Sequence, residues 1–562
     1  GSSVASTGVV VQIINTMTGA ITIDGTSAGS QGVIVGGLGS FISTGGTMGI
    51  SITGTTSSTD PDDFAVVLAS DGTTVDTTSN APITIVGNGQ NGLRIGNKNN
   101  IVPDSPTLSS TGGGDITYSG GSVEMANGGS VSTTGIVRLA VTGDVRQDTS
   151  LAPVLVPSIT AGQLGISATG EVDLLGDNAV DTLAIDAGGT VDYNNTSALT
   201  IGSVTASTPF PATSGVTAGG DVTVSVADGS TPDDDLKVNP GVTVQSTSGN
   251  VELNVGDDVD INGNLTASSG TVTINVDPAS GDPDAVGSSV DIDNGSTVTT
   301  NGGTFLNGGE DNDIFIFAPR TTTTFDVDGN PPVFADGPPA VPPGDTLHLD
   351  ITGLTDPTKT AGPGAGNGQY TFSNAQPVTY VSIETLELTP ATPIPVTFNG
   401  TAGDDNFWLR VDENGGTPLL ELLSGVTIGV SAGAITVSGG SVVDSRQLDH
   451  VVAYGINGLD GDDQLVIDYG YSLDTNSALE GLDVTFNGGD PTTSPGDALF
   501  VKEGTFGKVV YNYTDANSGN IENYSDDAGT SLQSTITYTA VSYTHLRAHE
   551  TTASISYAVF CL

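Results

Sequence analysis

The segment Ser248-Gly-Asn-Val-Glu-Leu-Asn-Val255 recurs 21 residues later as Ser269-Gly-Thr-Val-Thr-Ile-Asn-Val276, and this repeat indicates the type of fold. In both copies apolar residues alternate with polar ones, and this period of two predicts a β-strand with one buried face. The Gly, Asn and Ser residues before each strand favour a turn. A unit this short cannot bury its own apolar face, so we expect successive copies to stack on one another.

The same alternation occurs elsewhere in the first 300 residues. Leu164–Leu174 aligns with Leu183–Tyr193 at an offset of 19 residues. Looser copies lie at Gly32–Val35, Gly49–Ile52, Gly92–Ile95 and Gly220–Val226. We therefore predict an all-β chain with little or no helix, in which residues 1–300 form a right-handed parallel β-solenoid. A row of β-sandwich domains is the alternative, but a sandwich repeats over roughly 100 residues.

A second kind of repeat begins near residue 301. Asn307–Phe315 corresponds to Asn457–Leu465, and Pro343-Gly-Asp345 corresponds to Pro495-Gly-Asp497. Tyr370 pairs in the same way with Tyr511, which indicates a tandem β-rich module. We predict five segments: Gly-rich coils in 1–105, coils with repeats of about 20 residues in 106–300, a module with acidic Gly-Asn-Asp turns in 301–450, a truncated second copy in 451–540, and a tail in 541–562.

The tail does not continue either repeat. It reads VSYTHLRAHETTASISYAVFCL and holds the only cysteine, Cys561. Val541–Thr551 resembles one reading frame of a sequencing-library adapter, so we interpret 541–562 as non-native and exclude it from the fold. The rest of the chain then lacks cysteine, which excludes disulfides and thiol catalysis there. Because the repeat is already under way at Gly1, we expect a piece of a longer protein.

The chain carries 64 acidic and 12 basic side chains, a formal charge of −52. Such a surface cannot neutralise phosphate, so we predict no nucleic-acid partner. No apolar run approaches the roughly 20 residues of a membrane-spanning helix, and we predict no span in this segment. Self-repulsion of this charge opposes a compact fold, and divalent cations would relieve it.

A nine-residue phrase occurs three times, at Gly308–Ile316, Gly400–Trp408 and Gly458–Val466. Each copy resembles the glycine-rich nonapeptide of RTX-type calcium-binding β-rolls. The resemblance implies a tight glycine turn, a ligand Asp at the sixth position and an apolar core residue two positions later. It makes Ca²⁺ the expected cofactor, since this ion prefers oxygen ligands. The implied metal ligands are Asp313, Asp405 and Asp463, with the neighbouring Asp311, Asp404 and Asp462, and the implied core residues are Phe315, Phe407 and Leu465.

The match to the RTX phrase is incomplete. RTX rolls repeat the nonapeptide in tandem, so that successive turns share each ion, whereas each phrase here stands alone. Asp311 also replaces the later glycine in the first copy. The alternative is an acidic turn before a strand, with Asp selected for its turn propensity and solubility.

We find little support for catalysis and predict that the chain is not an enzyme. His348 and His450 are far apart in sequence, and we interpret both as structural. No nucleophile-elbow context is present. One alternative is a carbohydrate-active parallel β-helix enzyme with paired carboxylates. Another is a glycan-binding module that uses Trp408, the only tryptophan; in a regular strand it points outward, and we favour packing against a neighbouring module over sugar contact.

The repeats of residues 1–300, such as Gly220–Val226, Ser197–Val204 and Ser248–Gly256, resemble those of haemagglutinin-like and autotransporter-type adhesins. The later region resembles calcium-linked modules of similar giant extracellular proteins. This resemblance implies a structural or adhesive segment of a secreted or cell-surface bacterial protein, an elongated acidic rod stiffened by calcium. It also implies an extracellular or cell-surface location and a surface or matrix glycan or protein as ligand.

Overall fold

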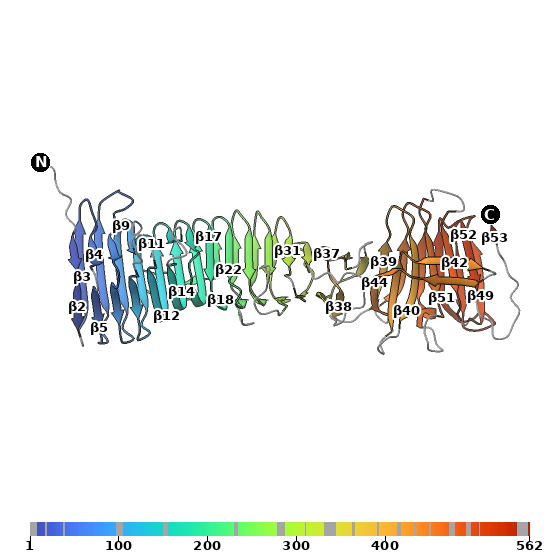
Figure 1. Ribbon diagram of the computed structural model, residues 1–562, viewed down its shortest axis with the longest axis horizontal. Helices are drawn as coiled ribbons and strands as arrows, with labels where there is room; N and C mark the ends of the chain where they lie inside the picture. The colour runs from blue at the N-terminus through green and yellow to red at the C-terminus, as the bar shows by residue number, and fades with distance from the viewer. Residues whose placement is uncertain are drawn as a thin grey trace. The chain divides into compact units, whose positions relative to one another are not determined.

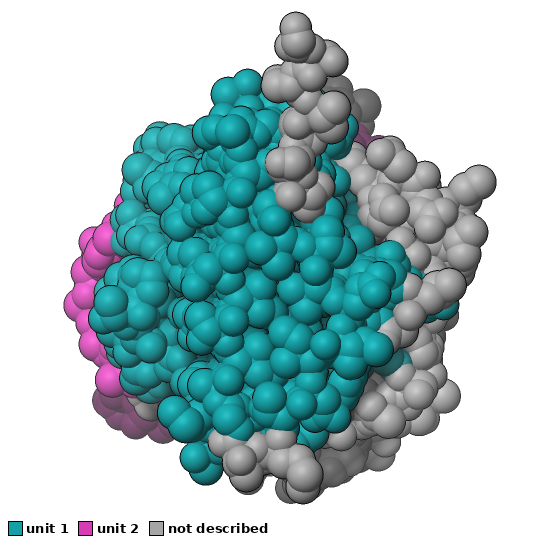
Figure 2. Space-filling model, turned by 90° about the vertical axis from the view of Figure 1, so that its left-hand side faces the viewer, with its two compact units in different colours: residues 1–317 teal, residues 318–562 magenta. Residues whose placement is uncertain are grey.

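The computed structural model describes residues 8–16, 19–37, 40–96, 105–126, 128–149, 156–229, 234–277, 287–309, 311–330, 344–361, 366–389, 393–412, 418–431, 434–448, 451–470, 478–490, 496–504, 506–547 and 560–561. Their regular elements are β-strands and one short 3-10 helix, η2 (Ala478–Gly481), which confirms the predicted all-β class. None of the described helical structure is long and apolar enough to cross a membrane. The chain forms two compact units, residues 1–317 and 318–562 (Figure 2).

In unit 1 the chain runs along three faces in turn, which we call faces A, B and C. Each strand pairs in parallel with the strand on the same face in the next passage, and we call one passage a coil. Strands of successive coils lie side by side from β2 to β31 (Figure 1).

Face A contains β1 (Val9–Val11), β4 (Val33–Gly36), β7 (Val66–Ala69), β13 (Val145–Asp148), β15 (Val172–Leu174), β17 (Val191–Asn195), β22 (Val222–Val226), β25 (Val251–Val255), β28 (Val272–Val276) and β31 (Thr304–Asn307). Face B contains β2 (Ile13–Thr16), β5 (Phe41–Thr44), β8 (Thr74–Thr77), β10 (Thr107–Ser110), β18 (Leu199–Ile201), β23 (Leu236–Val238), β26 (Val259–Ile261), β29 (Ser289–Ile292) and β32 (Ile314–Phe317). Face C contains β3 (Ile21–Ser27), β6 (Ile50–Thr56), β21 (Val216–Ala218), β24 (Thr243–Ser246), β27 (Asn264–Ala267) and β30 (Val298–Thr300). Longer strands pass from one face to the next: β9 (Ile83–Ile95), β11 (Ile116–Ala126), β12 (Ser130–Val141), β14 (Ser158–Ala168) and β16 (Ala179–Ala187).

The offsets between the sequence repeats of unit 1 equal the offsets between paired residues of its strands. Val251 pairs with Val272, the offset of 21 residues predicted from the sequence, and Leu164 pairs with Leu183, the offset of 19. The alternating apolar side chains of these strands point inward and are fully buried. Each large aliphatic residue buried in this way contributes about 1.5–3 kcal/mol of hydrophobic free energy, so stacking stabilises every coil.

Unit 2 combines parallel stacking with antiparallel insertions. Its parallel pairs are β33 (Phe325–Asp328) with β37 (Val378–Val381) and β34 (Thr346–Asp350) with β38 (Thr385–Thr389). One parallel stack contains β35 (Thr358–Ala361), β39 (Ile394–Asn399), β45 (Val451–Asn457), β47 (Asp483–Asn487) and β51 (Leu532–Thr539). A second contains β40 (Asn406–Asp412), β46 (Gln464–Asp468), β48 (Ala498–Lys502) and β52 (Tyr543–Arg547). The antiparallel strands are β36 (Gly368–Thr371), β41 (Leu419–Ser424), β42 (Thr427–Ser431), β43 (Ala434–Ser438), β44 (Ser441–Gln447), β49 (Lys508–Tyr513), β50 (Gly519–Tyr524) and β53 (Phe560–Cys561).

The division between the units falls after Phe317, so the first acidic phrase belongs to unit 1 and the other two belong to unit 2. The predicted segment boundaries at residues 105, 300, 450 and 540 stay predictions. The non-native origin of residues 541–562 also stays a prediction. Within this segment, β52 pairs with β48.

A hairpin lies on the outer side of unit 1. It contains β19 (Ser203–Val204) and β20 (Thr213–Ser214), and its Val204 and Phe210 pack on Ala184. Gly165 lies beside Ala184 in the sheet, and a Cβ atom at Gly165 would approach Phe210 Cζ to 2.6 Å. Small residues on the sheet therefore make room for the large side chain of the hairpin.

Candidate functional site

The three acidic phrases form corners between consecutive strands. They connect β31 to β32, β39 to β40 and β45 to β46, and in each case the sixth-position Asp lies directly before the second strand. The predicted core residues Phe315, Phe407 and Leu465 are buried, as expected. An asparagine ends the first strand of each corner, and Asn457 Nδ2 donates to Asn399 Oδ1 at 2.8 Å.

In unit 1, Asp313 binds two backbone amides. Its Oδ1 accepts the N–H of Ser288 from the previous coil at 2.9 Å, and its Oδ2 accepts the N–H of Gly309 at 2.7 Å. Burial, with the nearby Asp311, raises the pKa of Asp313 to about 6, and the two amides oppose this shift. Asp313 is thus an acceptor that links its own corner to the coil before it.

The same position is occupied by a column of small polar residues in earlier coils. Asp234, Asp257 and Ser288 lie on successive coils directly before Asp313 in the register. Asp257 Oδ2 accepts the N–H of Asp234 at 2.7 Å. We call these four residues the unit 1 column.

In unit 2 the structure brings two of the phrases together. Asp405 N–H donates to Asp463 Oδ1 at 2.8 Å, and Asp462 N–H donates to Asp404 Oδ1 at 2.9 Å, although these partners are 58 residues apart in the chain. Phrases that stand alone in the sequence are therefore stacked on adjacent coils. Asp313 and Asp311 lie in unit 1 and belong to another column.

A fourth corner, between β47 and β48, contributes Asp497. Asp463 N–H donates to Asp497 Oδ1 at 2.7 Å, so Asp405, Asp463 and Asp497 form a continuous series that we call the unit 2 column. Asp497 was not predicted as a ligand, because the loop before it is longer than the nine-residue phrase and does not match it. The match of Pro495-Gly-Asp497 to Pro343-Gly-Asp345 was the available signal: buried Asp345 also precedes a strand, and its N–H donates to Glu384 Oε2 at 2.9 Å.

The carboxylates of the unit 2 column are less well satisfied than Asp313. Asp405 Oδ2 accepts the N–H and the hydroxyl of Thr401, at 2.7 and 3.1 Å. The Oδ2 atoms of Asp463 and Asp497 are buried and have no hydrogen-bond partner among the described residues. Leu459, which corresponds to Thr401, has a φ of 77° and makes no such bond to Asp463.

Burial and like charge both act on Asp463. Its pKa is raised to about 7, first by desolvation and then by Asp405, Asp497 and Asp404. Burial also raises the pKa of Asp497. The column therefore favours a bound proton or a nearby cation over three adjacent negative charges.

The fit of these residues to calcium differs between corners. The oxygens of Asp313 face N–H donors, an arrangement that suits an anion acceptor rather than a cation ligand. Asp463 and Asp497 each keep one buried oxygen free. Within the described ranges no three His, Cys, Asp or Glu side chains are grouped to hold a metal ion, so backbone carbonyls would have to complete the six to eight oxygens that Ca²⁺ takes.

Most of the described basic side chains form ion pairs within their own unit. Ion pairs among the described residues include Arg94–Glu124, Arg138–Asp115, Arg146–Glu171, Lys237–Asp260, Lys359–Asp444, Arg410–Glu421 and Lys502–Asp468. His348 contacts Glu387 and Thr389 from a half-buried position, whereas His450 lies outside the described residues. Because 64 acidic side chains face only 12 basic ones and seven of the bases are paired, the charge of the chain remains strongly negative.

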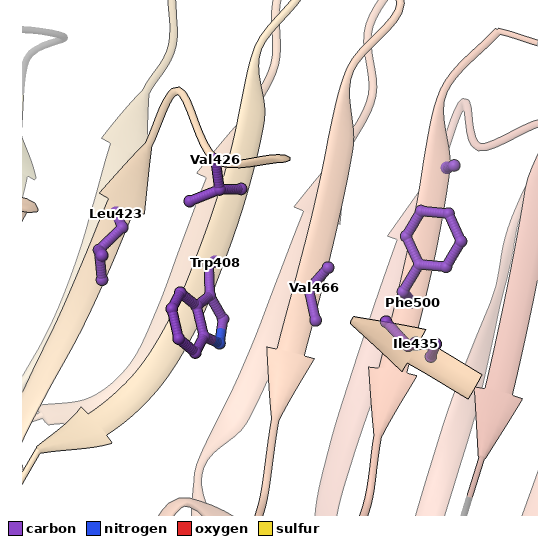
Figure 3. Packing of buried hydrophobic residues seen from close by; sticks show 7 residues of the cluster. Trp408, Leu423, Val426, Ile435, Val466 and Phe500 are labelled. Carbon is purple, nitrogen blue, oxygen red and sulfur yellow. The ribbon is translucent and has the colours of Figure 1, made fainter. Parts of the chain in front are cut away.

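Trp408 does not form an exposed platform. It lies on the side of β40 opposite the inward Phe407, as expected, but it is only 7% exposed. Trp408 belongs to one buried cluster with Val466 and Phe500 on the neighbouring strands and with Ile435 of the hairpin β42–β43 (Figure 3), and Ile428 and Val437 of the same hairpin pack against this cluster. The indole Nε1 donates to Asp468 Oδ2 at 3.2 Å. Trp408 is a packing residue within its own unit.

Comparisons with known proteins found no matching family model, no matching curated protein and no matching solved structure.

Proposed function

We propose that the chain is a structural or adhesive segment of a large secreted or cell-surface bacterial protein, built as a right-handed parallel β-solenoid. The observation that carries this proposal is the use of charged side chains between coils. Aspartates at the corners accept backbone amides from adjacent coils, and Arg146 bridges to Glu171 at 2.7 Å. Side chains that could perform chemistry are thus employed in holding the stack together.

The acidic outer surface supports the same proposal. A charge of −52 with paired bases keeps such a segment soluble and opposes binding to other acidic polymers. An extracellular or cell-surface location and a glycan or protein ligand of a cell surface or matrix are part of the proposal.

The alternative functions receive less support. A glycan-binding platform built on Trp408 would require removal of the hairpin that covers it. A glycosidase needs two carboxyl groups about 5–9.5 Å apart around an accessible bond, whereas the closely spaced carboxylates Asp463 and Asp497 are buried in a corner.

Calcium remains part of the proposal in a narrower form. Asp463 and Asp497 would hold the ion through their free Oδ2 oxygens, and the ion would neutralise the charge of the unit 2 column. Asp313, Asp311 and Asp405 would then be turn residues that do not bind the ion.

Display of the full chain on a non-adherent cell by a neutral carrier tests the proposal. We expect the chain to increase retention on surfaces coated with host glycans or matrix proteins, compared with the carrier alone at equal expression. Incubation with a panel of polysaccharides should release no reducing ends. Hydrolysis in the second assay, without retention in the first, would favour the enzyme.

A further inference from the structure

Unit 2 encloses a lysine among aromatic side chains. Lys359 occupies an inward position of β35, and its side chain is 2% exposed. Its Nζ lies 3.1 Å from Oδ1 of Asp444, which is located on β44, 85 residues later in the chain. The ring of Tyr380 lies 5.7 Å from Nζ.

A third polar group completes the arrangement. The hydroxyl of Tyr454 donates to Asp444 Oδ2 at 2.6 Å, so the two carboxylate oxygens face different partners. Asp444 and Tyr454 are both buried. An amine, a carboxyl group and a hydrogen-bond donor therefore meet in a site from which bulk water is excluded.

Packing alone does not explain a lysine at this position. Lys359 pairs in register with Val396 on the next strand of the same stack, and Val396 pairs with Tyr454. An apolar side chain is thus accepted at the adjacent level. A buried ion pair is costly to desolvate and is often replaced by apolar residues without loss of stability.

We propose that Lys359 and Asp444 form an intramolecular amide bond between Nζ and Cγ. The ammonium first transfers a proton to the carboxylate, which gives a neutral amine and a neutral carboxylic acid. The amine lone pair attacks Cγ, and the N–C bond forms. One C–O bond then breaks, and the departing oxygen leaves as water with two of the three ammonium protons. No oxidant, reductant or further reactant takes part.

The surroundings favour each step of this condensation. Burial disfavours both charged forms and so lowers the cost of the proton transfer that gives the reactive neutral pair. The fold holds the amine against the carboxyl group, which replaces a bimolecular encounter by an intramolecular one. Tyr454 donates to the oxygen on which negative charge develops during the attack.

The product would join β35 to β44, and thereby the stack of β39 and β45 to the antiparallel strands on β40. In a chain whose repeats contain no cysteine, such a bond would restrict the unfolded state in the way a disulfide does.

Mass spectrometry of the full chain tests the proposal. We expect an intact mass lower than the calculated mass by one water molecule. Trypsin should fail to cut after Lys359, because its amine is acylated, and should release one branched peptide in which residues 321–410 are joined to residues 411–446. Recovery of the separate peptides 321–359 and 411–446, at the unmodified intact mass, would overturn it.

Two variants locate the bond. Lys359→Met should release residues 411–446, which contain Asp444, as a linear peptide that is not joined to residues 321–410. Tyr454→Phe keeps the ring and removes the donor, and should reduce the linked fraction at least tenfold at early times after synthesis; an unchanged fraction would remove Tyr454 from the reaction. Mass spectrometry of the unmodified chain shows whether the Lys359–Asp444 bond is present even where a variant does not fold.

Discussion

In unit 1 and unit 2 the columns occupy the same position of each corner, directly before a strand. The residues at this position differ between the two units. In unit 1, Ser288 separates Asp257 from Asp313, and both oxygens of Asp313 accept backbone amides. In unit 2, Asp405, Asp463 and Asp497 follow one another without interruption, and two buried oxygens lack partners. Asp at this position accepts a backbone amide of the adjacent coil, whereas the buried Ser288 hydroxyl has no hydrogen-bond partner among the described residues. The choice of Asp or Ser therefore determines how much charge the stack must carry.

The outer hairpins of the two units differ in whether the hairpin or the sheet supplies the large side chains. In unit 1 the hairpin supplies the large side chain, Phe210, and the sheet supplies Gly165 and Ala184. In unit 2 the sheet supplies Trp408 and Phe500, and the hairpin covers them with smaller residues. Both solutions bury apolar surface outside the stack.

The largest effect is expected from truncation of these covered side chains. Trp408→Ala should lower the free energy of unfolding by about 3–5 kcal/mol, the usual result of removing a large buried aromatic residue. Phe210→Ala is the matched change in unit 1 and should cost a similar amount. Denaturant unfolding followed by circular dichroism measures both. A loss below about 1 kcal/mol for Trp408→Ala would mean that the hairpin does not pack as described.

The unit 1 column can be converted to resemble the unit 2 column. Ser288→Asp would place four carboxylates in series and should destabilise the chain by about 1–3 kcal/mol at pH 8. The penalty should diminish at pH 5, where a proton can be retained. Ser288→Asn, of similar size and without charge, is the control in the same unfolding experiment, and an equal penalty for both variants would assign the effect to size.

Calcium should distinguish the two columns. Millimolar Ca²⁺ should stabilise unit 2 by about 1 kcal/mol, given the dissociation constants of about 0.1–1 mM typical of extracellular modules. Fluorescence of Trp408, the only tryptophan, reports unfolding of unit 2. Mg²⁺ at matched ionic strength is the control.

Asp463→Asn and Asp497→Asn should abolish this stabilisation, and Asp313→Asn should leave it unchanged. Equal melts with Ca²⁺, Mg²⁺ and chelator would remove calcium from the proposal.

The smallest effect is expected on the asparagine ladder of unit 1. Asn275 Nδ2 donates to Asn254 Oδ1, and Asn307 Nδ2 donates to Asn275 Oδ1, each at 2.7 Å. Asn275→Ala should cost about 0.5–1.5 kcal/mol, the net worth of such bonds. Denaturant midpoints compared with Thr273→Ala, an outward neighbour on the same strand, would show whether the ladder contributes beyond strand propensity.

The sequence was sufficient to predict the coils of unit 1 because their period of two and their offsets are the physical register. Val251 and Leu164 were aligned with their true partners from sequence alone. The stacking of Asp405 on Asp463 could not be predicted, because the antiparallel insertion β41–β44 separates them in the chain. Asp497 was missed because its loop is longer, and the cover of Trp408 depends on a hairpin without a distinctive pattern.

The unit 2 column carries more negative charge than its hydrogen-bond donors satisfy. The most direct test is a thermal melt followed by Trp408 fluorescence at pH 5 and pH 8, in chelator, on the full chain and on Asp463→Asn. The folded state raises the pKa of Asp463 from its ordinary value of 3.8 to about 7. It therefore binds a proton that the unfolded state releases, and this stability is present below about pH 4 and is lost as the pH rises to about 7.

The melting temperature of the unmodified chain should fall between pH 5 and pH 8, whereas ordinary carboxyl groups are already ionised at pH 5. Asp463→Asn should show a clearly smaller fall. A melting temperature that is equal or higher at pH 8, or an identical fall in Asp463→Asn, would show that Asp463 does not retain a proton in the folded chain.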